Sequence, residues 1–92
     1  MTSYEFEVAA KNAVIKTIHD YYGEDYIIGD IQVVWFAHVF GNKKAMLIDM
    51  GPNFRVYEVT YRLSEDEMYV DTYKKENNSV IKSKDIDKNV HK

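Results

Sequence analysis

The sequence predicts an α+β fold, in which an N-terminal helix packs on one face of a four-stranded antiparallel meander sheet. An apolar stripe at helical spacing occupies the first 22 residues, and four segments rich in β-branched and aromatic residues follow, joined by short turns. A chain of 92 residues supports one hydrophobic core. We expect a single α+β domain over residues 1–76 and a polar C-terminal tail over residues 77–92, which is predicted to be mobile.

The helix is predicted over residues 2–22. Thr2 and Glu5 have capping-box spacing, in which a hydroxyl and a carboxylate accept hydrogen bonds from free backbone N–H groups. Gly23 is placed to end the helix in a left-handed conformation. The apolar stripe consists of Phe6, Ala9, Ala10, Ala13, Val14, Ile18 and Tyr21.

The strands are predicted over residues 31–40, 44–50, 54–63 and 68–75, because β-branched and aromatic residues dominate there. Turns are expected at 41–43, at 51–53, where Pro52 interrupts the ladder, and at 64–67. A short helical turn is expected near Ile86. Sequential strands with short turns favour antiparallel pairing.

The register predicts which side chains share a face. A two-residue turn at Asn42 and Lys43 pairs Val39 with Met46 and Trp35 with Met50. The predicted covered face then holds Val33, Trp35, Ala37, Val39, Met46, Ile48, Met50, Tyr57, Val59, Tyr61, Leu63, Met68 and Val70. The predicted open face holds Val34, Phe36, His38, Phe40, Ala45, Leu47, Asp49, Glu58, Thr60, Arg62, Tyr69, Asp71 and Tyr73. A slip of one residue in a strand exchanges its two faces.

An apolar patch on the open face is the candidate partner-binding site. Aromatic side chains beside an arginine have the composition of interface hot spots, and exposed apolar patches mark interaction sites. The candidate residues are Phe36, His38, Phe40, Leu47, Arg62, Tyr69 and Tyr73. The alternative is that the tail folds back and covers this patch through Val80, Ile81 and Ile86. Edge strands of the meander also offer a route to a homodimer.

Composition excludes several classes of site. The chain has no cysteine, and its three histidines lack metal-ligand spacing, so neither a thiolate site nor a metal site is predicted. His38 and Asp49 are predicted to lie diagonally on one face, but no nucleophile accompanies them, and a structural hydrogen bond is the favoured interpretation. We therefore expect no enzyme activity and no cofactor. The longest apolar run is too short to span a membrane, and the N-terminus does not resemble a signal peptide.

Two further binding hypotheses remain. A single-stranded nucleic acid would stack on Tyr69 and Tyr73, and its phosphates would meet Lys74, Lys75 and the lysines of the tail. A net charge of −3 disfavours nucleic acid as a partner. An acidic mimic of nucleic acid would use the carboxylates near the helix end. These are Asp20, Glu24, Asp25 and Asp30.

Four motifs resemble a family of short proteins of unknown function from phages and prophages of Gram-positive bacteria. They are VVWF at 33–36, NKKAML at 42–47, YEVTY at 57–61 and EMYVDTYKK at 67–75, followed by Asn77. The resemblance covers residues 31–81 and a preceding helix, whereas the 51–53 loop departs from the family. It implies a phage accessory protein in the cytoplasm of the bacterial host, with no known catalytic residues. Such proteins often block a host protein, so we expect a host bacterial protein as partner and, most specifically, an inhibitor of a defence system of the anti-CRISPR type.

Overall fold

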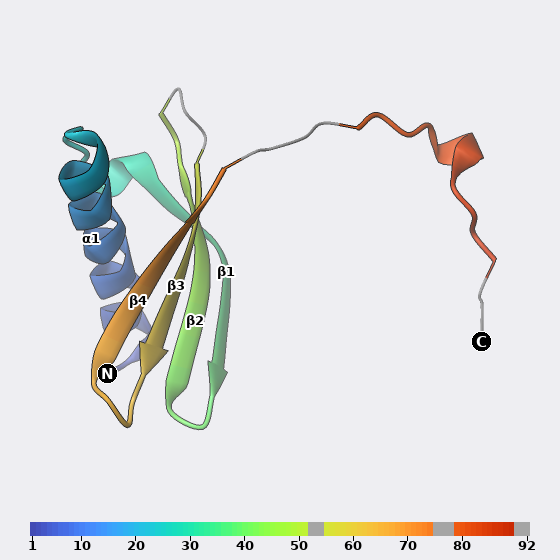
Figure 1. The fold of residues 1–92 in the computed structure, drawn as a ribbon. Helices are drawn as coiled ribbons and strands as arrows, with labels where there is room; N and C mark the ends of the chain where they lie inside the picture. Colours follow the sequence, from blue (N-terminus) through green and yellow to red (C-terminus); the bar gives the residue numbers. More distant parts are fainter. Residues whose placement is uncertain (52–54, 75–78, 90–92) are drawn as a thin grey trace.

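The computed structural model describes residues 1–51, 55–74 and 79–89. The helix α1 (Ser3–Tyr22) is followed by a short 3-10 helix, η1 (Ile28–Asp30). The strands come next and are β1 (Ile31–Val39), β2 (Asn42–Asp49), β3 (Val56–Arg62) and β4 (Glu67–Tyr73). A second short 3-10 helix, η2 (Ser83–Asp85), follows them. The strands form one antiparallel sheet in the order β1-β2-β3-β4. Figure 1 shows α1 on one side of this sheet, so the predicted α+β meander is confirmed.

The signals at both ends of α1 act as the sequence predicts. The Thr2 hydroxyl accepts the Glu5 N–H at 3.1 Å, and the Glu5 carboxylate accepts the Thr2 N–H at 2.9 Å. The second of these bonds, from the Thr2 backbone N–H, lowers the pKa of Glu5, because it stabilises the carboxylate as an anion. At the other end Gly23 has a φ of +68° and donates its N–H to the His19 carbonyl.

The core lies between α1 and the facing side of the sheet. The buried helix residues are Phe6, Ala10, Val14 and Ile18, and the buried apolar sheet residues are Ile31, Ala45, Leu47, Tyr57, Val59 and Tyr61. The helix contacts all four strands. A step of four residues keeps the helical positions on one stripe, while alternation along each strand sends every second side chain to the helix.

The turn between β1 and β2 lies two residues earlier than predicted. Phe40 and Gly41 form it, with φ values of +52° and +82°, and Val39 pairs with Asn42. Positive φ at both central positions defines a type I′ turn, whose twist matches that of the strands. The predicted pairing of Val39 with Met46 is therefore wrong, and Trp35 pairs with Met46 instead.

The pairing of β2 with β3 shows which face of β2 meets the helix. Leu47 pairs with Tyr57, so Leu47 faces the helix and Met46 faces away. The faces predicted for the residues of β3 and β4 are confirmed, but Leu63, predicted to be covered, lies in the turn after β3 and is exposed. The open and covered faces predicted for β2 are exchanged. On β1 an irregularity between Val33 and Trp35 turns Val33 toward the core and Trp35 outward.

The same registers separate His38 from Asp49. His38 pairs with Lys43 at the turn end of β1, whereas Asp49 pairs with Ile31 at the opposite end. Seven residue steps along β1 separate these positions, or roughly 23 Å at about 3.3 Å per step. The predicted contact between the imidazole and the carboxylate is therefore wrong.

The segment 79–89 does not lie over the sheet, and Figure 1 shows it leading away. Val80, Ile81 and Ile86 are 85%, 64% and 50% exposed, so they do not form the predicted alternative cover. The predicted helical turn near Ile86 corresponds to η2. The loop positions 52 and 53, the strand ends at 54 and 75 and the boundary after 76 lie outside the described residues. No described helix combines the length and apolarity needed to cross a membrane.

We predict that Phe40→Asn stabilises the fold. Phe40 is 96% exposed and therefore contributes little packing, while a non-glycine residue in the left-handed region costs about 1–2 kcal/mol. Asn before Gly is the preferred pair in a type I′ turn. The free energy of unfolding in urea should rise by about 0.5–1 kcal/mol. Phe40→Ala is the control and should bring no such gain, and a less stable Asn variant would contradict the prediction.

Candidate functional site

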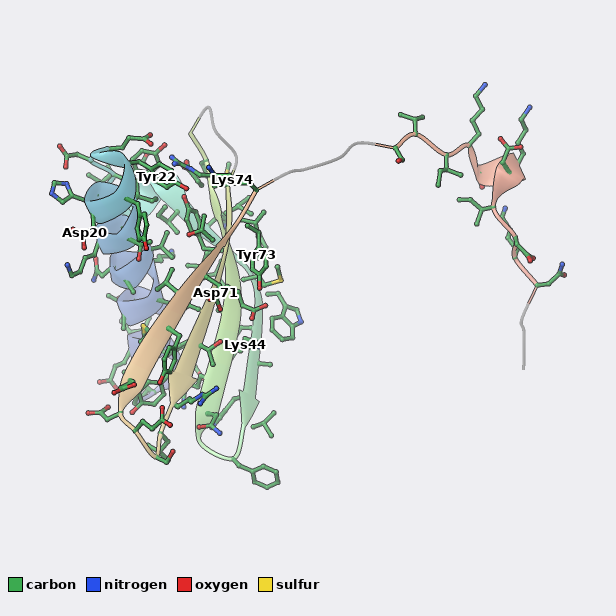
Figure 2. All side chains as sticks on the ribbon, viewed as in Figure 1. Asp20, Tyr22, Lys44, Asp71, Tyr73 and Lys74 are labelled. Atoms are coloured by element: carbon green, nitrogen blue, oxygen red, sulfur yellow. The ribbon has the colours of Figure 1, made fainter. Side chains whose placement is uncertain are left out.

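The side of the sheet away from α1 is open, and its side chains form rows across the four strands. Trp35, Met46, Glu58 and Asp71 make one row, and Gln32, Ile48, Val56 and Tyr73 make the next. A third row consists of Ala37, Lys44, Thr60 and Tyr69. Figure 2 shows Lys44, Asp71 and Tyr73 projecting on the side away from the helix. The first row is apolar on β1 and β2 and acidic on β3 and β4.

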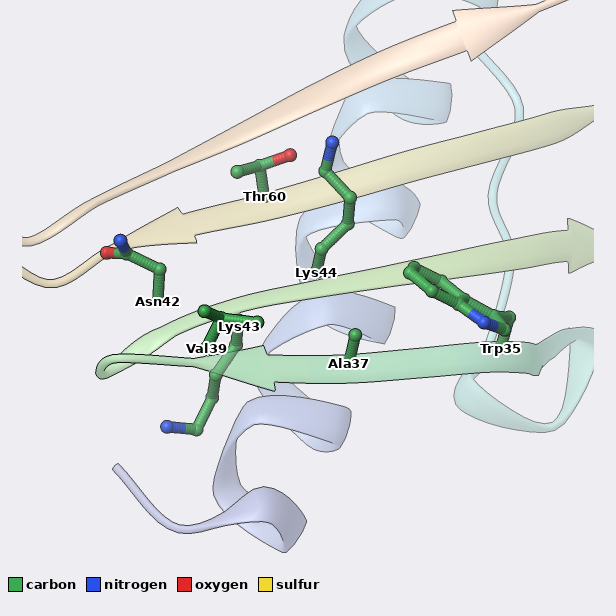
Figure 3. A pocket seen from close by; sticks show the side chains of 7 residues that line it. All are labelled: Trp35, Ala37, Val39, Asn42, Lys43, Lys44 and Thr60. Carbon is green, nitrogen blue, oxygen red and sulfur yellow. The ribbon is translucent and has the colours of Figure 1, made fainter.

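The apolar half of this open face is centred on Trp35. Trp35 is 49% exposed although it is the largest side chain of the protein, and its row neighbour Met46 is half-buried. Beside Trp35 lies a shallow hollow of about 270 Å³, lined by Trp35, Ala37, Val39, Asn42, Lys43, Lys44 and Thr60 (Figure 3). Its lining is mostly apolar, which suits an apolar side chain of a partner.

An ion pair marks the border between the two halves. The Lys44 ammonium lies 3.1 Å from the Glu58 carboxylate, and it reaches across from β2 to β3. Both side chains remain partly exposed, so the pair adds little stability but fixes two opposite charges beside the apolar half. The open face therefore has an aromatic centre with a charged rim, as protein interfaces do.

Tyr69 and Arg62 belong to a polar cluster at the β3–β4 turn. The Tyr69 hydroxyl donates to Glu67 at 2.6 Å and has Glu65 within 2.7 Å, and these contacts raise the pKa of Tyr69. The Arg62 guanidinium lies 5.2 Å from the centre of the Tyr69 ring. The aromatic ring is thus held by the chain's own charges at this corner of the open face.

The structure separates the seven candidate residues. Arg62, Tyr69 and Tyr73 lie on the open face and are exposed, as predicted. Leu47 is fully buried under α1, so its predicted exposure is wrong. The other three belong to β1 and its turn and do not lie on the open face, so that part of the prediction is wrong. Phe36 packs against Phe6 with ring centres 5.6 Å apart while staying 39% exposed, His38 is exposed on the helix side of the β1 edge, and Phe40 occupies the turn.

The residues that sequence reasoning missed are the apolar ones predicted for the core. These are Trp35, Ala37, Val39, Met46 and Ile48. Both faces of β1 and β2 are apolar, so hydrophobicity alone does not distinguish them. The available signal was Phe40-Gly41, because Gly at the second central position suits a type I′ turn.

Comparison with known protein families relates this chain to one of them. The model of a family of unknown function, DUF6275, matches residues 7–83. The chain belongs to this family. Neither among curated proteins nor among solved structures does any match the chain. The matched range takes in most of α1, η1 and the whole sheet, so the open face lies within it.

A buried ionic cluster at the other end of the core is a second place with unusual chemistry. Asp49 is fully buried and Arg55 is 7% exposed. The Arg55 Nη2 lies 2.7 Å from Glu24 and 3.5 Å from Asp49, and the guanidinium carbon lies 3.7 Å from the centre of the Tyr22 ring. The Gly51 N–H donates to Asp49 Oδ1. These contacts tie the segment after α1 to the ends of β2 and β3.

The contacts of this cluster are structural, because they join the segment after α1 to the sheet. Burial lowers the pKa of Arg55, but hydrogen bonds to Glu24 and Tyr22 outweigh it, so the pKa is raised and the cation is secured. Within residues 1–51, 55–74 and 79–89, no three His, Asp or Glu side chains lie close enough together to hold a metal ion. The cluster thus stabilises the edge of the core, whereas the open face offers a surface to a partner.

We predict that Arg55→Met destabilises the DUF6275 chain by about 3–5 kcal/mol, because the Asp49 carboxylate is then buried without a cation. Urea unfolding measures the loss. Adding Asp49→Asn to this variant should recover part of it, since no fully buried carboxylate then remains without a cation. Arg62→Met removes an exposed arginine as the control and should change stability by less than about 0.5 kcal/mol. An Arg55 variant as stable as its control would contradict the prediction.

A second prediction concerns alkaline pH. Burial raises the pKa of Tyr57 from 10.0 to about 12, and the buried hydroxyl has no hydrogen-bond partner among the described residues. As pH rises through this window the unfolded chain loses a proton that the folded chain keeps, so stability falls. Tyr57→Phe removes that loss. The variant should match the wild type or slightly exceed it at pH 7, and its advantage should grow between pH 10 and 12. An advantage that stays constant with pH would refute this assignment.

Proposed function

We propose that the DUF6275 chain is a non-catalytic binding protein that docks on another protein through its open face. The observation that carries the proposal is Trp35, a half-exposed tryptophan beside a hollow on a face that no described element covers. Tryptophan is enriched in hot spots, where a few side chains supply most of the binding free energy. The charges of Lys44 and Glu58 form a polar rim and favour one orientation of the partner.

The finer form of the proposal concerns the partner. Resemblance to short proteins of phages and prophages supports an accessory role in the cytoplasm of a Gram-positive bacterial host. We propose that the partner is a host protein and that binding blocks it. The most specific version is inhibition of a bacterial defence system of the anti-CRISPR type. Docking without chemistry suffices for such inhibition, and the open face supplies a surface for docking.

Two observations disfavour nucleic acid as the ligand. Tyr69, one of the two predicted stacking residues, lies beside Glu65 and Glu67, whose charges repel phosphate. The open face also mixes both signs of charge instead of presenting a basic groove. Of the lysines assigned to phosphate, Lys74 lies 5.9 Å from the centre of the Tyr22 ring, and Lys75 lies outside the described residues.

The acidic-mimic hypothesis loses support for a similar reason. A mimic needs carboxylates that are free to replace phosphates, but all four proposed acids have internal contacts. The pairs are Asp20 with Lys16 at 2.8 Å, Glu24 with Arg55 at 2.7 Å, Asp25 with His19 at 3.0 Å and Asp30 with the Ile27 N–H at 2.9 Å. Protein docking through an apolar centre therefore agrees better with the geometry.

The test is capture of a partner by the wild type and by a variant of the open face. We expect Met46→Lys to abolish capture, because it places a charge beside Trp35. Met46 is only half-buried, and Glu58 and Asp71 in the same row supply negative charge, so the fold should be preserved. Tyr21→Lys adds the same charge on the exposed helix surface and is the matched control. Both are compared by affinity purification from expressing bacteria with mass spectrometry.

The functional arm measures plaque formation by a phage that a CRISPR system of the same bacteria targets. Wild type and Tyr21→Lys should restore plaques, and Met46→Lys should not. Equal capture by all three proteins would overturn the assignment of the open face. Capture that depends on Met46 without restored plaques would retain the docking function and reject the anti-CRISPR version.

A further inference from the structure

The sheet has two edge strands, and they differ in charge. β4 carries Glu67 and Asp71, and Tyr69 between them is bonded to carboxylates. β1 has nine residues and none of them is Asp, Glu, Lys or Arg. Charged side chains on an edge strand prevent pairing with another strand, and β1 lacks them. The β1 edge is therefore the edge that is better suited to pair with a further strand.

The type I′ turn fixes which backbone groups of β1 are free. In a two-residue hairpin the closing residues, Val39 and Asn42, direct both N–H and C=O toward each other. Alternation then directs the backbone groups of Ala37 and Trp35 toward β2 as well. Phe36 and His38 direct theirs outward, where no strand of the described residues pairs with β1. The outward-directed N–H and C=O groups thus belong to Phe36 and His38, one residue on each side of Ala37.

We propose that a second copy of this chain pairs with β1 in antiparallel orientation, with the two-fold axis at Ala37. Phe36 of one copy then lies opposite His38 of the other, and these two pairs form four backbone hydrogen bonds. Trp35 lies opposite Val39 on the open face. The irregularity ends at Trp35 and the strand ends at Val39, so Ala37 is the midpoint of the regular stretch.

The side chains fit this pairing. Trp35 and Val39 are 49% and 58% exposed in the single chain, and the symmetric register brings them together across the edge. On the helix side, the exposed part of the Phe36 ring lies beside His38 of the second copy. No like charges meet anywhere along the seam, because β1 has no charged residue. The two sheets join into one of eight strands, and the two apolar halves become neighbours.

This inference goes beyond the proposed function, since the dimer needs no other protein. It is tested by a charge exchange at Ala37. Ala37→Asp places two carboxylates opposite each other in the dimer, and Ala37→Lys does the same with two ammonium groups. We expect the wild type to dimerise with rising concentration in sedimentation equilibrium, and each variant to remain monomeric. An equimolar mixture of the two variants should recover a heterodimer that weakens as salt rises.

Two further variants keep the test decisive if a charge at Ala37 disturbs folding. His38→Pro removes one outward N–H without affecting a bond to β2, and should weaken the dimer about tenfold or more. Asp71→Lys changes the same face at the opposite edge and should leave dimerisation unchanged. Circular dichroism verifies that each variant is folded. A wild type that is monomeric up to near-millimolar concentration overturns the proposal, and so does a mixture that forms no heterodimer or a dimer that Asp71→Lys abolishes.

Discussion

One helix faces a sheet whose β1 and β2 strands are apolar on both sides, and this constraint determines the rest of the molecule. α1 contributes four buried residues and covers one side only. A sheet that is apolar on both sides requires a second cover, and the described residues supply none. The consequence is an exposed tryptophan on the face away from the helix. Stability and binding thus use opposite faces of the same strands, so a change on the open face can be tested for binding without removing the core.

The covered face of β2 includes the buried ion pair of Asp49 and Arg55. Every second residue of β2 faces α1, and these residues include Ala45, Leu47 and Asp49. Aspartate is rarely buried in proteins. The desolvation of the Asp49 carboxylate is offset by Arg55 and by the Gly51 N–H. The opposite side of β2 offers Met46 and Ile48, which are equally apolar. A contact between residues six positions apart in the chain therefore agrees with a register that hydrophobicity alone leaves open.

These features explain how far the sequence predicts the structure. The capping box, the helical stripe, Gly23 and the four strands follow from local signals, and all of them are present. The faces of β3 and β4 follow because polar and apolar residues alternate there. The faces of β2 do not follow, because a charged residue is buried and apolar ones are exposed. The same difference affects the candidate site. The predicted exposure of Arg62, Tyr69 and Tyr73 on the open face is correct. Leu47 is buried instead of exposed, and Trp35 is exposed although its pattern predicts burial in the core.

The irregularity in β1 connects the core with the exposed edge. It allows Val33 to pack under the helix while Trp35, two residues later, faces the open side. Without the extra residue, strict alternation would place both on one face, and burying Val33 would also bury Trp35. The same irregularity limits the regular part of the edge to the five residues from Trp35 to Val39. A short uncharged edge next to an exposed aromatic permits specific pairing while offering little length for open-ended aggregation. Local geometry in one strand thus sets both the aromatic centre of the open face and the extent of the edge available to a second strand.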